Sequence, residues 1–285
     1  MKRAGLDIGS TTVKAAVIGE NDELLYSQYR RHFSDIRKTV FDIISELGEH
    51  FKGERMMIAV TGSGGISVSK WLGIPFVQEV AAGTNAIKKL IPRTDVAIEL
   101  GGEDAKIIYF EGGNVEQRMN GICAGGTGSF IDQMASLLQT DATGLNEYAR
   151  DYDTLYPIAA RCGVFAKSDV QPLLNEGAAR EDIAASILQA VVTQTISGLA
   201  QGRPIKGNIV FLGGPLHFLP QLRRQFEETL KDNAKSFKTP ENAQLFVAIG
   251  AALMYEDKTS DIDTLISQLA NAKSVDAEIT RMRKP

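Results

Sequence analysis

The stretch AGLDIGSTTVKAAVI, residues 4–18, decides the fold, because its pattern returns as VAIELGGEDAKIIYF at residues 96–110. The two stretches align without a gap, so that Asp7 matches Glu99. Each copy reads as an apolar strand, an acidic residue, a turn that contains glycine and a second apolar strand, which is the pattern of a β-hairpin. A repeat of this length predicts two similar α/β lobes.

Strands followed by helices occur twice along the chain. Apolar residues at helical spacing follow each hairpin, most clearly over residues 35–49 and 179–200. Two lobes with this order of elements predict an α/β protein with a cleft between the lobes. The predicted division is a first lobe over residues 1–95, joined by a helix over 242–256, a second lobe over 96–241, and a C-terminal helix or tail over 257–285.

Shorter segments of the sequence predict further local structure and the exposure of single residues. We expect a strand over residues 76–79 before a helix that begins near Gly83. VTGSGG at residues 60–65 has glycines but not the surroundings of a dinucleotide fingerprint, and it is interpreted as a turn. His32 is expected on a solvated flank, and Asp7 in a turn at the surface.

The composition is typical of a soluble globular protein. The chain has 285 residues, of which 44% are hydrophobic and 23% charged, which is enough to bury a substantial core. A net charge of -4 gives no electrostatic footprint for nucleic acid, and no apolar run approaches the length of a membrane span. The N-terminus enters a strand directly and lacks the pattern of a secretory signal, so we expect a cytoplasmic protein.

The turn of the first hairpin, within DIGSTTVK at residues 7–14, has the chemistry of a phosphate site. A carboxylate at a strand end can hold Mg²⁺ through water, while turn amides and hydroxyls contact phosphate oxygens and a lysine adds a point charge. The alternative is an ordinary polar turn. The repeated motif favours phosphate, because two such turns can clamp one nucleotide. The candidate residues are Asp7, Gly9, Ser10, Thr11, Thr12 and Lys14 in the first turn, and Glu99, Gly101, Gly102 and Asp104 in the second.

A third glycine motif lies in FLGGPLHF at residues 211–218, where a strand is expected to turn into a helix. Bare backbone at Gly213 and Gly214, followed by Pro215, would let a nucleoside approach closely. Alone, a GGP turn does not identify a ligand.

The chain contains two cysteines, Cys123 in NGICAGGTGSF and Cys162 in ARCGVFAKSDV. A disulfide is not expected without a secretory signal, so both are either buried small hydrophobic residues or ligands of a metal or a cluster. Two thiolates cannot complete a site of four cysteines. If the ligands of a 4Fe-4S cluster are all cysteines, two identical chains must each provide two, which places the cluster on a dimer axis.

The three glycine motifs, in this order and spacing, resemble those of the actin, sugar-kinase and heat-shock ATPase superfamily. That resemblance implies a ribonuclease H-like fold of two duplicated lobes around an ATP cleft. NGICAGGTGSF, ARCGVFAKSDV and ELGGEDAK further resemble the BadF/BadG/BcrA/BcrD ATPase family, whose best-known members activate 2-hydroxyacyl-CoA dehydratases. The resemblance covers residues 2–256, and it is greatest to the nucleotide-binding modules of long CoA-enzyme activases. Glu99 and Glu103 stand where the short activators usually have Asp and Gln.

The resemblance implies an ATP-dependent one-electron reductase. It assigns Cys123 and Cys162 of two subunits to one 4Fe-4S cluster per homodimer. Helices expected over 127–138 and 167–174 would add electropositive N-termini that favour thiolates. The implied partners are a second copy of the chain, a 2-hydroxyacyl-CoA dehydratase or a benzoyl-CoA-reductase-like metalloenzyme, and ferredoxin or flavodoxin as the electron donor.

The resemblance also implies roles around ATP or ADP with Mg²⁺. Asp7, Glu99 and Asp104 are expected to act in hydrolysis. The remaining nucleotide contacts are expected from the other residues of both hairpin turns and from Gly126, Thr127, Gly128, Gly213, Gly214, Pro215 and Gln244.

Two other functions stay open at this point. Small-molecule kinases of the amino-sugar type occur in the same superfamily, and one would need a carboxylate base near the γ-phosphate, for which Asp104 is the candidate. A non-catalytic, nucleotide-responsive docking module of a long activase would leave the chemistry to its partner. Of the three functions, only the reductase predicts bound iron and sulfide.

Overall fold

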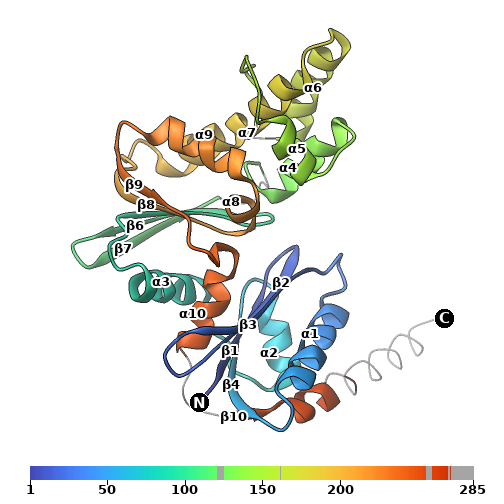
Figure 1. Cartoon of the computed structure of the whole chain (residues 1–285), viewed down its shortest axis with the longest axis vertical. Coiled ribbons are helices and arrows are strands. Elements are labelled where there is room, and N and C mark those ends of the chain that lie inside the picture. The colour runs from blue at the N-terminus through green and yellow to red at the C-terminus, as the bar shows by residue number, and fades with distance from the viewer. Residues whose placement is uncertain (121–124, 161, 255–258, 269, 271–285) are drawn as a thin grey trace, which may run out of the picture. The chain divides into compact units, whose positions relative to one another are not determined.

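The computed structural model describes residues 1–120, 125–160, 162–254, 259–268 and 270 (Figure 1). The chain divides into two compact units. Unit 1 combines Met1–Ile91 with Leu245–Pro285, and unit 2 is Pro92–Gln244. Each unit is built on a sheet of five strands.

The sheet of unit 1 has the strand order β10-β4-β1-β2-β3. β1 pairs antiparallel with β2 and parallel with β4. The bounds of the strands are β1 (Arg3–Ile8), β2 (Thr12–Ile18), β3 (Leu24–Arg31), β4 (Arg55–Thr61) and β10 (Thr259–Asp261).

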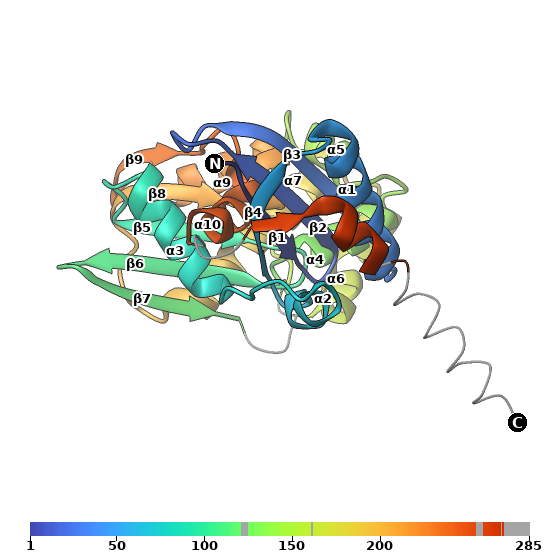
Figure 2. The same ribbon diagram turned by 90° about the horizontal axis from the view of Figure 1, so that it is seen from below.

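Helices cover both faces of this sheet because both faces are apolar. Its helices are α1 (Ile36–His50), α2 (Gly65–Leu72), α3 (Glu79–Leu90) and α10 (Phe246–Met254). Leu6 and Ile58 belong to a cluster with residues of α1 and α2. Ala59, which points to the other face, packs with residues of α3 and α10. α3 and α10 lie side by side (Figure 2).

The sheet of unit 2 has the order β7-β6-β5-β8-β9. β5 pairs antiparallel with β6 and parallel with β8, so the series β7-β6-β5-β8 repeats the series β3-β2-β1-β4 of unit 1 in order and direction. The sequence repeat is therefore a structural repeat. The bounds are β5 (Val96–Leu100), β6 (Ala105–Glu111), β7 (Asn114–Met119), β8 (Gly207–Leu212) and β9 (Ala234–Lys238).

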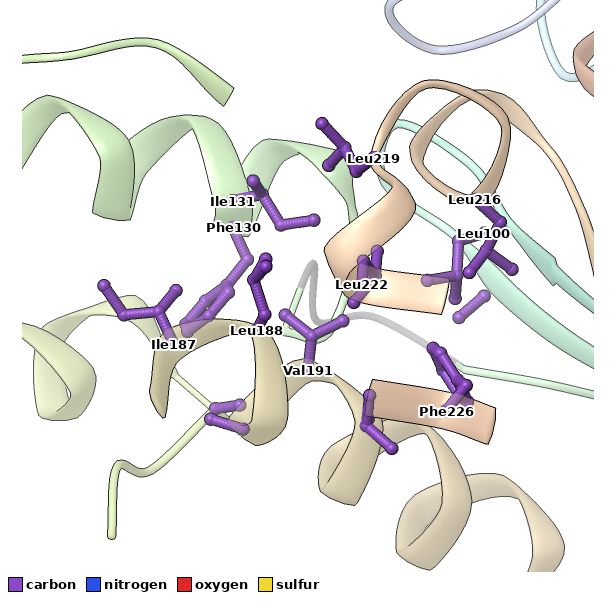
Figure 3. Packing of buried hydrophobic residues seen from close by; sticks show 14 of the residues in the cluster. Leu100, Phe130, Ile131, Ile187, Leu188, Val191, Leu216, Leu219, Leu222 and Phe226 are labelled. Atoms are coloured by element: carbon purple, nitrogen blue, oxygen red, sulfur yellow. The ribbon is translucent and has the colours of Figure 1, made fainter. Parts of the chain in front are cut away.

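The core of unit 2 lies between its sheet and α4, α7 and α9 (Figure 3). Phe130 of α4, Leu188 of α7 and Phe226 of α9 are buried in one cluster with Leu100 of β5. The helices are α4 (Gly128–Leu137), α5 (Ala142–Tyr148), α6 (Gly163–Asn175), α7 (Arg180–Thr195), α8 (Gly214–Phe218) and α9 (Pro220–Leu230), with a π-helical turn over Ile196–Ala200 and a 3-10 turn over Ala243–Leu245.

The helix over Arg180–Ala200 is long and apolar enough to cross a membrane by length and composition alone. Within the protein, however, 67% of its most apolar window is buried. Its apolar side chains therefore have a protein core to pack against, as in the central helix of a globular domain.

The chain between β4 and α3 differs from the expectation. The strand expected over residues 76–79 is a single bridge between Val60 and Phe76, and α3 begins at Glu79 rather than near Gly83. An acidic residue in the first turn is favoured by the helix dipole, which explains the earlier start. Within VTGSGG, residues 62–64 form the expected turn, between the end of β4 at Thr61 and the start of α2 at Gly65.

Gly250 of α10 and Gly83 of α3 give a matched test of this helix pair. A Cβ on Gly250 would overlap the Ala82 carbonyl oxygen, whereas a Cβ on Gly83 would meet only Val247 Cγ2 at 3.8 Å. Alanine improves helix propensity by about 1 kcal/mol at either position. We expect Gly250→Ala to lower the free energy of unfolding in urea by about 1–3 kcal/mol, and Gly83→Ala to leave it unchanged or raise it. Equal stability of the two variants would contradict this packing.

Candidate functional site

A buried ion pair closes the first hairpin. Asp7 and Lys14 are direct partners in the β1–β2 ladder, and Lys14 Nζ donates to Asp7 Oδ2 at 2.7 Å. Gly9 N donates to Thr12 O at 2.9 Å, which completes the turn. Asp7 is only 3% exposed, so its expected position at the surface was wrong. The partner cation is what makes burial of a carboxylate possible here.

His32 supports this turn, although sequence reasoning placed it on a solvated flank. It is buried, and its Nδ1 accepts a hydrogen bond from Ser34 N at 3.0 Å. The ring proton is therefore on Nε2, which donates to Gly9 O at 3.2 Å. His32 N also donates to Thr11 O at 3.2 Å. One residue thus fixes the backbone on both sides of Ser10, which is exposed.

The VTGSGG segment lies against Asp7. Gly62 has a φ of +89°, and a Cβ there would lie 2.5 Å from both Asp7 Oδ1 and Ile8 O. Gly64 N donates to Ile8 O at 2.9 Å. Glycine is therefore required at residue 62 both by the backbone and by the carboxylate. The signal that could have found it is its position directly after β4, the parallel neighbour of β1.

The second hairpin repeats the ion pair. Glu99 and Lys106 are direct partners in the β5–β6 ladder, and Lys106 Nζ donates to Glu99 Oε1 at 3.0 Å. Lys106 Nζ also lies 2.7 Å from Asp104 Oδ2. Gly101 N donates to Asp104 O at 2.8 Å, and a Cβ on Gly101 would overlap the Asp104 carboxylate. The side chain of Asp104 is 36% exposed and that of Glu99 11%, so Asp104 is the more accessible of the two.

The start of α4 is joined to the second turn. Gly128 N donates to Gly101 O at 3.0 Å, and Ser129 N donates to Gly102 O at 2.7 Å. A Cβ on Gly128 would lie 3.3 Å from Pro215 Cγ of α8. The predicted residues around Gly101, Gly128 and Pro215 therefore come together within unit 2, although they are far apart in the sequence.

Two more glycines of unit 2 have positive φ angles and closely approach neighbouring residues. Gly213 has a φ of +88°, and a Cβ there would overlap the Leu100 carbonyl oxygen. Gly126 has a φ of +76°, and a Cβ there would lie 3.4 Å from Thr195 Oγ1. Thr127, between Gly126 and α4, is fully buried.

Gln244 lies beside the Gly213 turn. Gly213 N donates to Ala243 O at 3.0 Å, so the 3-10 turn that carries Gln244 is tied to the end of β8. Gln244 Oε1 is buried and has no hydrogen-bond partner among the described residues. A buried amide oxygen without a partner is uncommon and often indicates a missing ligand or water.

Arg223 fixes α8 from its C-terminal end. Its Nη1 donates to Leu216 O at 2.6 Å and to His217 O at 2.8 Å. Burial, and secondly the charge of Arg223, lowers the pKa of His217, so the imidazole is neutral at pH 7.

Cys162 is the N-cap of α6. The helix begins at Gly163, directly after the cysteine, and not at the expected Lys167. Cys162 is partly exposed and not in a disulfide, and its side chain makes no capping hydrogen bond to the helix amides. Val164 and Phe165, in the first turn of α6, are 72% and 65% exposed. Cys123 lies outside the described residues.

Side chains of α6 and α7 hold the extended segment that leads to Cys162. Each of three side-chain oxygens accepts hydrogen bonds from backbone N–H groups of this segment. The pairs are Asp182 Oδ1 with Asp153 N (2.8 Å) and Thr154 N (2.9 Å), Ser186 Oγ with Tyr156 N (2.7 Å), and Asp169 Oδ2 with Ala159 N (2.8 Å). Asp169 therefore has a structural role, and the segment over residues 153–159 is held without regular secondary structure.

Comparison with known proteins gives relatives along nearly the whole chain. A curated relative, the (R)-2-hydroxyglutaryl-CoA dehydratase activating ATPase of Acidaminococcus fermentans, is 28% identical over 253 residues, which are 87% of this chain and 95% of the relative. The crystal structure of component A of the Acidaminococcus fermentans (R)-2-hydroxyglutaryl-CoA dehydratase matches with a TM-score of 0.78 and 30% identity, covering 89% of this chain and 96% of that one.

A second solved structure is the activator of the 2-hydroxyisocaproyl-CoA dehydratase from Clostridium difficile with bound ADPNP. It matches with a TM-score of 0.77 and 26% identity and covers 98% of both chains. The expected fold, two duplicated α/β units of the actin, sugar-kinase and heat-shock ATPase type, is confirmed by these neighbours and by the repeated strand order. The profile of the BadF/BadG/BcrA/BcrD ATPase family matches residues 4–254, and the chain belongs to this family.

Proposed function

We propose that the protein is an ATP-dependent activator that transfers one electron from a 4Fe-4S cluster, shared by two copies of the chain, to an enzyme that acts on a CoA thioester. The observation that carries the proposal is Cys162 at the N-cap of α6, partly exposed in a member of an ATPase family. Its relatives include a dehydratase activating ATPase and an activator with bound ADPNP, so nucleotide use and dehydratase activation are the expected activities.

The hairpin turns supply the chemistry for MgATP. In this proposal Asp7 holds Mg²⁺ through water, while Gly9, Ser10, Thr11 and Thr12 contact phosphate oxygens and Lys14 offsets their charge. Gly101 and Gly102 contact phosphate in unit 2, where Glu99 and Asp104 both neighbour Lys106. Asp104 is the better candidate to orient the attacking water, because its carboxylate is the more exposed.

The nucleoside is assigned to the region around Gly213, Gly214 and Pro215. Gln244 Oε1 is buried and has no partner in the part of the chain that the structure describes, which supports this assignment, because an acceptor there would suit an amino or hydroxyl group of the nucleoside. Gly126, Thr127 and Gly128 are assigned to the same nucleotide, because Gly128 N contacts the Gly101 turn.

The surroundings of Cys162 fit a cluster ligand. Cys162 lies directly before the first turn of α6, and its side chain makes no capping hydrogen bond to the helix amides. The exposed pair Val164 and Phe165 beside it would be covered in a homodimer, as expected if Cys123 and Cys162 of two subunits share the ligand set. The cluster, when bound, supplies a one-electron reductant. The proposed partners are a 2-hydroxyacyl-CoA dehydratase or a benzoyl-CoA-reductase-like enzyme, and ferredoxin or flavodoxin as donor, all in the cytoplasm.

Changing Asp7 to asparagine tests the hydrolytic site. Asparagine keeps the size of the side chain and can still accept from Lys14, but it removes the charge that would hold Mg²⁺. We expect Asp7→Asn to lower kcat for ATP hydrolysis about 100-fold or more, with an unchanged circular dichroism spectrum. Asp35→Asn, at the N-cap of α1, is the matched control and should keep full activity. Wild-type ATPase activity in Asp7→Asn would exclude this role.

Gly214 tests the nucleoside assignment. It is buried at the start of α8, and a branched side chain there would occupy space proposed for the nucleoside. We expect Gly214→Val to raise the apparent KM for ATP about 10-fold or more and to keep the iron content of the wild type. A parallel loss of iron would instead indicate misfolding of unit 2, and an unchanged KM would contradict the assignment.

The two cysteines test the cluster. Because the ligands would come from both subunits, Cys123→Ser and Cys162→Ser should each lose iron and weaken the dimer together. MgADP binding should be unchanged in both variants, because neither cysteine is among the residues assigned to the nucleotide. Analytical ultracentrifugation with iron analysis, under anaerobic conditions, makes the comparison. A variant without either cysteine that stays equally dimeric and fully active in electron transfer would favour the kinase or docking function instead.

A further inference from the structure

Thr61, the last residue of β4, carries a buried hydroxyl that no described residue satisfies. The residue is 0% exposed, and its Oγ1 makes no hydrogen bond to any part of the chain that the structure describes. Leaving a buried donor unpaired opposes folding, so such a group is expected to have a partner in the working state of the protein.

The strand register places Thr61 beside Asp7. The two residues are partners in the parallel β1–β4 ladder. Side chains of register partners point to the same face of a sheet, and successive residues alternate between faces. Leu6 and Val60, which precede them, belong to the cluster on the opposite face. Asp7 and Thr61 therefore share one face at the end of the sheet.

The Asp7 carboxylate lies against the backbone next to this hydroxyl. Asp7 Oδ2 accepts from Lys14, while Asp7 Oδ1 lies 2.5 Å from the position that a Cβ would take on Gly62, the residue after Thr61. The carboxylate thus extends along the Thr61–Gly62 backbone. An oxygen bound by Asp7 through Mg²⁺ or water on this face would come near the Thr61 hydroxyl, which can donate to it.

We propose that Thr61 is a positioning residue of the ATPase reaction: its hydroxyl donates to an oxygen of the magnesium–phosphate group held at Asp7, either a phosphate oxygen or a water on Mg²⁺. The inference rests on the proposed function, because it requires MgATP at the first hairpin. Nucleotide binding then removes an unsatisfied group from the core of unit 1. Thr61 couples the stability of this unit to the occupancy of its phosphate site.

Thr61→Val gives two opposite effects that a purely structural residue would not give. Valine has nearly the same shape but no hydroxyl, so in the nucleotide-free protein it removes an unpaired donor and should raise Tm by about 2–4 °C. In saturating MgADPNP the Thr61 hydroxyl of the wild type gains a hydrogen bond that valine cannot make. The higher Tm of the variant should therefore disappear or become a lower Tm. We expect kcat for ATP hydrolysis to fall about 10-fold or more, and Thr61→Ser to restore it.

Thr39 of α1 is the matched control. It is buried in the same unit, but its Oγ1 already donates to Asp35 O at 2.9 Å. Thr39→Val should therefore lower Tm by a similar amount with and without nucleotide, and it should leave kcat unchanged.

MgADP and MgADPNP separate the two possible acceptors. If the Tm gain of Thr61→Val over the wild type disappears in both complexes, the acceptor is a β-phosphate oxygen or a water on Mg²⁺. If the gain disappears in MgADPNP alone, the acceptor is a γ-phosphate oxygen. Either result supports the proposal. A Tm gain that is equal in the free and bound protein, with unchanged kcat, would overturn it, and so would a lower Tm of the nucleotide-free variant. If the wild type itself gains no stability from either nucleotide and hydrolyses no ATP, the proposed function fails first.

Discussion

A pair of a buried carboxylate and a lysine, across each hairpin, is the interaction around which both candidate phosphate turns are built. Asp7 with Lys14 and Glu99 with Lys106 occupy equivalent positions in the two ladders, at the point where the first strand of each hairpin ends. Removing a carboxylate from water is costly unless a cation is adjacent, so the lysine is what allows an acid to lie under a tight glycine turn. The lysine of each pair also places an ammonium group beside the turn where phosphate is proposed to bind.

The rest of each site is assembled on these turns through backbone contacts. In unit 1, Gly62 and Gly64 approach the end of β1, and His32 holds the Gly9 carbonyl. In unit 2, Gly128 and Ser129 donate to the second turn, and Gly213 packs on Leu100. Contacts of this kind leave no room for side chains, which explains why glycine recurs in segments far apart in the sequence. Large apolar clusters behind each turn keep these backbones in place.

The repeated hairpin could be predicted from the sequence because a strand pattern, an acid and a lysine recur at fixed spacing, and this was enough for the fold. The failures concern tertiary contacts. Asp7 looked exposed because turn residues usually are, but pairing with Lys14 buries it. His32 and VTGSGG carried no motif, since their roles arise only when β3 and β4 lie beside the β1–β2 hairpin. The start of α6 was misplaced because Gly163 is a poor helix former, yet the first helical hydrogen bond, from Ala166 N to Cys162 O at 3.0 Å, forms there.

In the proposed function this ATPase carries a cluster and delivers electrons, rather than transferring phosphate to a metabolite. The content of iron and acid-labile sulfide in the wild-type protein, purified and assayed without oxygen, distinguishes these two activities. We expect about four iron and four sulfide per two chains. A homogeneous, nucleotide-binding protein that contains neither, even after anaerobic reconstitution with iron and sulfide, would contradict it.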